Sequence, residues 1–302
     1  MPTVLIPGGT GLIGRHLSEL LRKHDYEVLH LSRTRDLDAE FPAYHWDIQK
    51  KELDLDALER ADYVVNLAGA GIADGLWTQS RREAIINSRV DGTLLLREGI
   101  QKVQTKPTAY IGSSANGIYG DRGAELLPET ARPGEGFLAE TTKLWETAID
   151  KVKTTGVRVA GLRTGIVLST QGGAFQKIYA PFKFGLGSYF GDGSAYYSWI
   201  HIDDICRMYL HLIENDLSGY FNGNAPEPVT IKELAYAIKD VREKPAIVAS
   251  VPTFALRMTM GEMADVVLSS TRADASKIGE SGFEWQFSEL KPALRDLITR
   301  QV

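Results

Sequence analysis

The chain of 302 residues contains a single cysteine, Cys206. One thiol cannot form an internal disulfide, and no part of the sequence has the paired-cysteine spacing of a structural zinc site. We therefore expect Cys206 to be a small buried residue on a helix rather than a nucleophile. The histidines are scattered through the sequence, which predicts no metal site. Such low cysteine usage is typical of a reducing compartment, and we expect a cytoplasmic protein.

The sequence also has no excess of basic residues and no long apolar run. It has 34 Lys and Arg against 39 Asp and Glu, a net charge of −5. This balance argues against a nucleic-acid partner and against binding to an anionic membrane surface. No apolar stretch reaches membrane-spanning length, and the first residues lack the basic start of a signal peptide. Hydrophobic residues make up 43% of the chain, as in ordinary globular proteins, and we expect a small molecule as the partner.

Short apolar runs alternate with longer stretches of helical periodicity in the first half of the chain. This alternation predicts βαβ units, a parallel sheet and an α/β fold of the doubly wound Rossmann type. The expected strands are 3–6, 26–33, 43–48, 61–69, 107–114 and 157–168, and the expected helices are 12–23, 78–99 and 137–153.

The pattern changes after about residue 169, where glycine and aromatic residues dominate a segment with little periodicity. Long irregular segments in compact proteins are often binding loops. Helices are expected at 203–215, at 230–241, where Thr230 and Glu233 have the spacing of a capping box, and at 288–299. We therefore predict a nucleotide-binding domain at 1–168, completed by parts of 200–225, and a smaller C-terminal α+β lobe at 169–302.

The segment "GGTGLIG" follows the first expected strand directly and opens the first expected helix. Gly8 would permit a tight turn, Gly11 would let the backbone approach a pyrophosphate, and Gly14 would let helix and strand pack closely. The free N–H groups of the helix N-terminus would then face the phosphates. In this context the motif predicts a dinucleotide site, with Thr10, Leu12 and Ile13 also at the cofactor.

The end of the second expected strand indicates which dinucleotide is bound. An NAD site usually has Asp or Glu there for the ribose 2′-hydroxyl. This chain has Ser32, Arg33 and Arg35, and arginine can hold a 2′-phosphate through two hydrogen bonds. We expect NADP(H) rather than NAD(H), with Arg33 as the main contact and Ser32 as a helper. Further contacts are expected from Asp47, beside the adenine, and from the backbone of Leu67, Ala68 and Gly69.

Several motifs together resemble the extended short-chain dehydrogenases/reductases of the nucleotide-sugar epimerase and dehydratase branch. They are "GGTGLIG", "NLAG", "IGSSANGIYGD", "GLRTGIVL" and "WIHIDDICRMYLHLI", in the order usual for that family. The segment 252–297 is similar to a C-terminal domain of unknown function found in an atypical subgroup called "epimerase family". The resemblance implies a Rossmann domain carrying NADP(H), with the substrate bound between it and the C-terminal lobe.

The resemblance also implies catalytic residues. Ser114 matches the serine that contacts the reacting hydroxyl or carbonyl, although it is one residue further from Tyr119 than is usual. Lys143 matches the lysine of the Tyr-x-x-x-Lys pair, which would hold the nicotinamide ribose. The tyrosine of that pair, the usual general acid and base, is replaced by Ala139.

Three explanations for the missing tyrosine remain open. Another group could supply the proton: Tyr119 is nearest by motif, and Asp121, Glu140, Thr142 and His201 are alternatives. The substrate could need little acid–base help, so that positioning suffices. Lastly, the protein could bind NADP(H) as a sensor or regulator without turnover.

On the substrate side, Trp199 could cover a ring, and His201 is a further candidate contact. We therefore expect an oxidoreductase or epimerase-like enzyme acting on a small carbonyl or hydroxyl substrate, either free or nucleotide-linked. The alternative is a non-catalytic NADP(H)-binding protein. A homodimer formed by the two long helices at 78–99 and 137–153 is compatible with both.

Overall fold

A central sheet of eight strands organises the computed structural model, which describes residues 1–242 and 244–300. Its strands, in spatial order, are β13 (Gly219–Gly223), β8 (Arg158–Thr164), β6 (Ala109–Ala115), β5 (Tyr63–Asn66), β1 (Thr3–Pro7), β2 (Glu27–Ser32), β3 (Ala43–Asp47) and β4 (Glu52–Leu53). All neighbours are parallel except β3 and β4. The strand order reverses between β1 and β5, where open α/β sheets form their binding crevice. The predicted Rossmann fold is confirmed.

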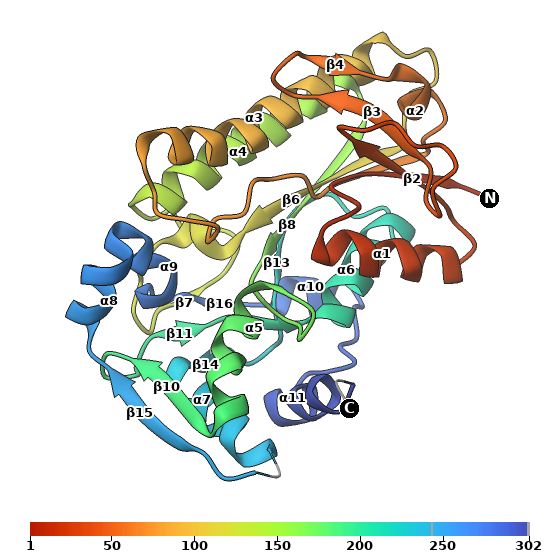
Figure 1. Ribbon diagram of the computed structural model, residues 1–302. Helices are drawn as coiled ribbons and strands as arrows, with labels where there is room; N and C mark the ends of the chain where they lie inside the picture. Colours follow the sequence, from red (N-terminus) through yellow and green to blue (C-terminus); the bar gives the residue numbers. More distant parts are fainter. Residues whose placement is uncertain (243, 301–302) are drawn as a thin grey trace.

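Helices cover both faces of the sheet (Figure 1). Helices α1 (Leu12–Lys23) and α6 (Ile202–Glu214) pack together on one face. Helices α3 (Gln79–Lys102) and α4 (Phe137–Val152) pack together on the other, and the short α2 (Leu55–Glu59) contacts α3. Most residues of the interior strands are buried because both faces of the sheet are covered.

The expected strand at 157–168 is two strands. β8 ends at Thr164, and β9 (Ile166–Leu168) leaves the central sheet to pair with β12 (Trp199–His201). The break lies at Gly165, where a Cβ atom would be 2.2 Å from the carbonyl oxygen of Ser198. The close approach of two backbones, which sequence periodicity does not report, therefore turns the chain out of the sheet.

Helices and two-stranded pairs make up the rest of the chain. The helices are α5 (Gly173–Tyr179), α7 (Ile231–Val241), α8 (Thr253–Met260), α9 (Asp265–Leu268), α10 (Ser276–Glu280) and α11 (Leu290–Thr299). The pairs are β10 (Leu186–Phe190) with β15 (Ile247–Val251), β11 (Tyr196–Tyr197) with β14 (Val229–Thr230), and β7 (Leu126–Leu127) with β16 (Arg272–Ala273). No helix within the described ranges is long and apolar enough to cross a membrane.

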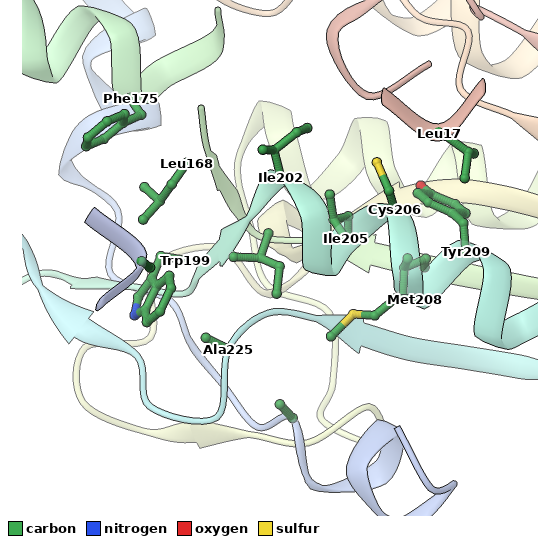
Figure 2. Packing of buried hydrophobic residues seen from close by; sticks show 14 of the residues in the cluster. Leu17, Leu168, Phe175, Trp199, Ile202, Ile205, Cys206, Met208, Tyr209 and Ala225 are labelled. Carbon is green, nitrogen blue, oxygen red and sulfur yellow. The ribbon is translucent and has the colours of Figure 1, made fainter. Parts of the chain in front are cut away.

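One apolar core joins these parts. It extends from Val4 in β1 to Leu297 in α11, and it includes Trp199 and Cys206 (Figure 2). Cys206 is a free, buried thiol on α6, and burial raises its pKa well above the ordinary value, so it is a poor nucleophile. The domain boundary at 168 stays a prediction, although β13 and α6 do belong to the central layer.

Candidate functional site

The glycine loop after β1 has a backbone that only glycine can supply at two positions. Gly8 has a φ of +83°, and a Cβ atom there would lie 2.8 Å from the carbonyl carbon of Leu67. A Cβ atom on Gly14 would lie 2.4 Å from the carbonyl oxygen of Gly8. The loop is therefore closely packed against the segment after β5, and the N-terminus of α1 opens beside it with unpaired N–H groups.

A buried histidine, His30 of β2, packs against this glycine loop. The hydroxyl of Ser18 donates to the carbonyl oxygen of Gly14 at 2.8 Å, so the ring Nε2 of His30, 2.8 Å from the same hydroxyl oxygen, must donate to it. The ring also lies directly under Gly9, where a Cβ atom would be 2.2 Å away. Burial lowers the pKa of His30 to about 4, so the imidazole is neutral at neutral pH.

The loop forms one wall of a cavity of about 870 Å³ at the carboxyl ends of β1, β5 and β6. The opposite wall comes from the N-terminal turn of α4 and from the 3₁₀ turn at Asn116–Tyr119. The segment 257–271 of the C-terminal part closes a third side. The cavity is thus built from both parts of the chain, at the switch point of the sheet.

The predicted cofactor residues fall into two groups around this cavity. Seven of them line it: Gly8, Gly11, Leu12, Ile13, Gly14, Leu67 and Gly69. The others, apart from Lys143 on α4, are next in sequence to lining residues (Thr10 and Ala68), at or just after the end of β2 (Ser32, Arg33 and Arg35), or at the end of β3 (Asp47).

At the end of β2 the two arginines differ in their surroundings. Arg35 forms an ion pair with Asp54 at 3.5 Å and lies over the ring of Tyr44. The guanidinium of Arg33 is exposed and has no ion-pair partner in the described part of the chain. Asp47 is engaged in its own turn, where it accepts the N–H groups of Gln49 and Lys50 at 2.9 and 3.1 Å. Arg33 is therefore the arginine available to a ligand.

Helix α4 does not present Lys143 to the cavity. The residues on its cavity face are Phe137, Leu138 and Thr142. Ala139 is fully buried, and Lys143 pairs with Glu140 on the exposed side of the helix. The two residues of α4 that lie four positions apart and face the cavity are Leu138 and Thr142. Neither a tyrosine nor a lysine of a Tyr-x-x-x-Lys pair therefore faces the cavity. The assignment of Lys143 to the nicotinamide ribose does not agree with this orientation.

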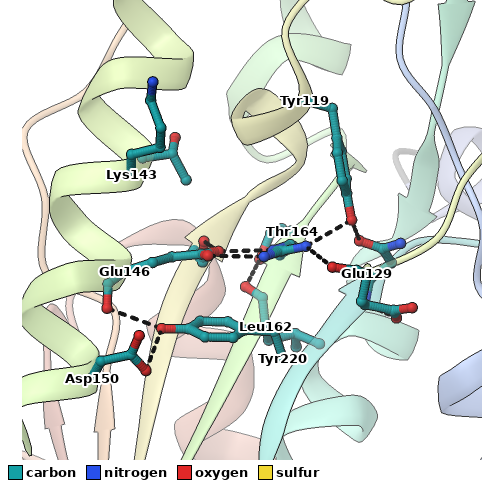
Figure 3. A network of polar contacts seen from close by, with 12 residues as sticks. Tyr119, Glu129, Lys143, Glu146, Asp150, Leu162, Thr164 and Tyr220 are labelled. Carbon is teal, nitrogen blue, oxygen red and sulfur yellow. Dashed lines mark hydrogen bonds and ion pairs between the residues drawn. The ribbon is translucent and has the colours of Figure 1, made fainter. Parts of the chain in front are cut away.

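Ser114 bonds to Glu146, which belongs to a network of polar contacts that also includes Tyr119 (Figure 3). Side chains alternate along β6, so Ser113 lines the cavity and Ser114 points to the other face of the sheet. The Ser114 hydroxyl donates to Glu146 Oε1 at 2.6 Å, and Arg163 donates to both oxygens of the same carboxylate, at 2.8 and 2.9 Å. The position corrects the expectation that Ser114 contacts a substrate: its side chain is 2% exposed and its proton is engaged.

Tyr119 belongs to the same network. Its hydroxyl donates to Asn222 at 2.7 Å and accepts from Arg163 at 2.9 Å. Burial raises the pKa of Tyr119, and the neighbouring Arg163 opposes this rise only in part. Tyr119 is fully buried and does not line the cavity, so this geometry gives it no proton to transfer to a bound ligand.

The two predicted substrate residues are also buried away from the cavity. Trp199 packs in the core (Figure 2), and its indole N–H donates to the carbonyl oxygen of Glu227 at 3.0 Å. His201 accepts the N–H of Asp203 through Nδ1 at 3.1 Å and so caps α6, with its ring against Phe287. Burial lowers the pKa of His201, and the carboxylates of Asp203 and Asp296 oppose this effect. Both residues hold the C-terminal part in place.

His201, Asp203 and Asp296 bring three possible metal ligands within 4.8 Å of one another. Arg300 occupies this cluster, since its guanidinium lies 2.6 Å from Asp203 Oδ2 and 2.8 Å from Asp296 Oδ2. Arg300 already pairs with both carboxylates, and the group is explained as an ion-pair network.

The cavity contains polar residues that the motif analysis did not select. Ser113 and Asn116 line it, and the side-chain oxygen of Asn116 is buried with no hydrogen-bond partner among the described residues. Arg89 of α3 also lines it, beside Gly69. The sequence held a signal for Arg89: it falls in the helical stripe formed by Ile85, Thr93 and Leu96, and a lone arginine in a buried stripe is unusual.

Known proteins share this fold and sequence along nearly the whole chain. The model of the NAD dependent epimerase/dehydratase family matches residues 4–222, and a domain of unknown function (DUF1731) matches residues 251–297. The epimerase family protein YfhF of Bacillus subtilis is 34% identical over 298 residues, which are 98% of this chain and 97% of YfhF.

Solved structures agree. The crystal structure of the human epimerase family protein SDR39U1 with NADPH has a TM-score of 0.86 at 27% identity and covers 98% of this chain and 99% of that one. A nucleoside-diphosphate sugar epimerase from Corynebacterium glutamicum has a TM-score of 0.78 at 32% identity, over 98% of this chain and 58% of that one. These matches confirm the resemblance seen in the motifs: the chain belongs to the NAD-dependent epimerase/dehydratase family, in the group that carries the C-terminal domain of unknown function.

Proposed function

We propose that this protein is an NADP(H)-binding oxidoreductase or epimerase-like enzyme for a small carbonyl or hydroxyl substrate. The observation that carries the proposal is the glycine loop, with its two obligate glycines, at the head of a cavity of about 870 Å³. A cavity of this size falls in the usual range for cofactor and ligand sites. The human SDR39U1 structure, which contains NADPH, has the same fold along the whole chain.

The residues present fit such a cofactor. The backbone N–H groups at Leu12 and Ile13 begin α1 and face the cavity, where they would hold the pyrophosphate. The exposed guanidinium of Arg33 would hold the 2′-phosphate of the adenosine ribose. NADP(H), when bound, supplies or accepts a hydride at its nicotinamide ring.

The chain's own residues define the substrate end of the cavity. Phe137, Leu138 and Val266 supply apolar walls, while Ser113 and Asn116 offer hydrogen bonds that would orient a carbonyl or hydroxyl group. Of the five groups considered as replacements for the missing tyrosine, Asp121 and Thr142 line the cavity. Asp121 is the titratable one of the two, and we assign to it the proton transfer that accompanies hydride transfer. A nucleotide-linked substrate is proposed only by analogy with the epimerase from Corynebacterium glutamicum.

Calorimetric titration with NADPH and NADH tests the cofactor assignment. Wild type should bind NADPH at least about tenfold more tightly, because a charge-assisted bond to phosphate contributes about 1.5–3 kcal/mol. Arg33→Ala should remove most of that preference and leave NADH affinity unchanged. Arg35→Ala is the matched control, since Arg35 already pairs with Asp54. Equal affinity of wild type for the two cofactors would refute the assignment.

A non-catalytic NADP(H)-binding regulator is the second candidate function. It is favoured by the cavity face of α4, where Leu138 and Thr142 replace the usual acid–base pair. A library of aldehydes, ketones and sugar nucleotides separates the two, when it is screened by NADPH absorbance for net reduction and by product analysis for epimers, whose formation consumes no NADPH. Turnover that falls at least about tenfold in Asp121→Asn would support the enzyme. Silence across the library, with tight NADPH binding, would support the regulator.

We also propose that the protein can form a homodimer through α3 and α4. Leu144 on the outer face of α4 is 49% exposed, and paired helices of this kind can form a symmetric interface. Sedimentation of wild type and Leu144→Glu tests this: a wild-type dimer that Leu144→Glu converts to monomer supports it, and a monomeric wild type rejects it.

A further inference from the structure

The substrate end of the cavity has an apolar wall that comes from three separate segments of the chain. Trp77 belongs to the loop between β5 and α3, Phe137 and Leu138 to the first turn of α4, and Val266 to α9. All four side chains line the cavity and are partly exposed. Such a wall favours a ligand whose apolar part removes these side chains from water.

The two aromatic rings of this wall are held in place by their neighbours. The ring centres of Trp77 and Phe137 are 4.7 Å apart, with the planes tilted by 60°. The indole N–H donates to the carbonyl oxygen of Ile72 at 3.0 Å. The guanidinium of Arg82 lies over both rings, 4.7 Å from the centre of Phe137 and 5.8 Å from that of Trp77, and pairs with Glu262. The rings therefore offer a ligand apolar contact and no free hydrogen-bond donor.

The basic residues that line the cavity leave no free cation at this end. Among the described residues they are Arg89, Lys177 and Arg257. Arg257 pairs with Asp265 at 3.1 Å, and the ammonium of Lys177 donates to the carbonyl oxygen of Ala73 at 3.0 Å. Arg89 lies at the cofactor end, beside the loop after β5. A diphosphate is usually held by arginine or lysine side chains, and those of this cavity are engaged or lie elsewhere.

Two carboxylates at the substrate end would repel an anionic ligand. Asp121 and Glu135 line the cavity, and neither forms an ion pair with another described residue. Asp121 accepts backbone N–H groups, those of Gly123 and Ser270, at 3.4 and 3.2 Å. The diphosphate of a nucleotide sugar would thus bring like charges together, which discriminates against such a ligand.

We infer that the substrate is an uncharged, largely apolar aldehyde or ketone, or the corresponding alcohol, rather than a nucleotide sugar. Phe137, Leu138 and Val266 would contact its apolar part and so determine specificity, while Asn116 and Asp121 would meet its oxygen atom. This inference rests on the proposed function, because it assumes that NADP(H) occupies the other end of the cavity. It selects the free substrate where the proposed function leaves free and nucleotide-linked substrates open.

The experiment measures the binding of alcohols to the full chain saturated with NADPH. A reduced cofactor cannot accept a hydride from an alcohol, so turnover does not interfere with the measurement. The fluorescence of bound NADPH reports binding. The apolar ligands are butan-1-ol, pentan-1-ol, hexan-1-ol and benzyl alcohol, and the polar ligands are sorbitol and UDP-glucose. The variants are Leu138→Asn and Val266→Thr, which keep the approximate side-chain size and add polar atoms. Leu144→Asn, the same change on the exposed face of α4, is the matched control.

Affinity should rise about three- to fourfold with each methylene from butan-1-ol to hexan-1-ol, the gain from removing one CH₂ group from water. Sorbitol and UDP-glucose should bind at least about tenfold more weakly than hexan-1-ol. Leu138→Asn should weaken hexan-1-ol and benzyl alcohol at least about fivefold, and Val266→Thr should weaken them less. NADPH affinity should stay within about twofold in both variants, which shows that they are folded, and Leu144→Asn should match wild type.

Three results would overturn the inference. UDP-glucose could bind more tightly than hexan-1-ol, affinity could be the same along the alcohol series or in Leu138→Asn, or no alcohol could bind to the NADPH complex. In each case the cofactor assignment still stands, because NADPH is bound. A wild type that binds neither NADPH nor NADH would instead contradict the proposed function itself, and this result is distinct from all three.

Discussion

At the residue scale, orientation rather than identity decides which side chains belong to the site. The spacing of Ala139 and Lys143 matches the family's pair, yet on α4 the residues one position earlier, Leu138 and Thr142, are those that face the cavity. A helix places residues four apart on one face, but adjacent residues are rotated by about 100°. When one residue of the pair is replaced, the spacing alone therefore does not show which way the side chain of the other residue points.

This orientation makes Lys143 dispensable for cofactor binding. Its ammonium pairs with Glu140 on the exposed side of α4, and exposed pairs contribute less than about 1 kcal/mol to stability. Lys143→Ala should therefore change NADPH affinity by less than about twofold, measured by the calorimetric titration used for Arg33→Ala. A loss of tenfold or more would place the ammonium at the ribose after all.

Ser114→Ala should affect stability and leave binding intact. The change removes the hydroxyl that donates to Glu146 Oε1 at 2.6 Å, while Arg163 still bonds that carboxylate. We expect a decrease of about 1.5–3 kcal/mol in the free energy of unfolding, the usual contribution of one hydrogen bond to a charged group. Urea denaturation measures the decrease. Reduced NADPH affinity or turnover at full stability would return Ser114 to the active site.

At the element scale, the sequence predicted those features that depend on local chemistry. The strand, glycine loop and helix at the N-terminus could be predicted because β-branched residues, three spaced glycines and an apolar stripe all lie in one short segment. The break between β8 and β9 could not, since it arises where Gly165 meets the backbone of Ser198, far away in sequence. Ser114 was misplaced for a related reason: the strand's alternation was known, but not which face held the cavity.

The stability of the fold around the glycine loop depends on the protonation state of His30 in β2, which packs against Gly9 of that loop. The folded pKa of His30 is about 4, below the unfolded value of 6.5, so the folded state binds fewer protons between these values. His30 therefore stabilises the fold fully above about pH 6.5, and this contribution is lost as the pH falls toward 4. We expect a loss on the order of 2–3 kcal/mol from pH 7 to pH 4.

His30→Gln provides the comparison, because its amide can still donate to Ser18 and does not titrate. The wild-type free energy of unfolding should fall more steeply with acidification than that of His30→Gln over the same range. Parallel pH profiles of the two proteins, measured by urea denaturation, would show that the imidazole is not the titrating group.

At the scale of the whole molecule, one core makes the two parts of the chain interdependent. The same apolar cluster includes Val4 in the first strand and Leu297 in the last helix. The cavity is also built from both parts of the chain, because the glycine loop and residues from the segment 257–271 both line it. The sequence shows a change in composition near residue 169. It does not show that residues before and after this point pack into the same apolar core, because that depends on the tertiary structure.

Asp204 links the last segment to the central layer and tests this continuity. It is fully buried on α6, and its carboxylate accepts the N–H groups of Gln286 and Phe287 at 2.8 Å each, as well as a bond from Arg207 at 2.9 Å. Asp204→Ala would leave these donors without a partner, at a cost of about 3–5 kcal/mol. Because the core is shared, the whole molecule should unfold at lower urea concentration in one transition, with coincident curves from far-UV circular dichroism and tryptophan fluorescence. Two separated transitions would mean that the C-terminal segment detaches alone, and that the cavity can lose one wall while the Rossmann layer stays folded.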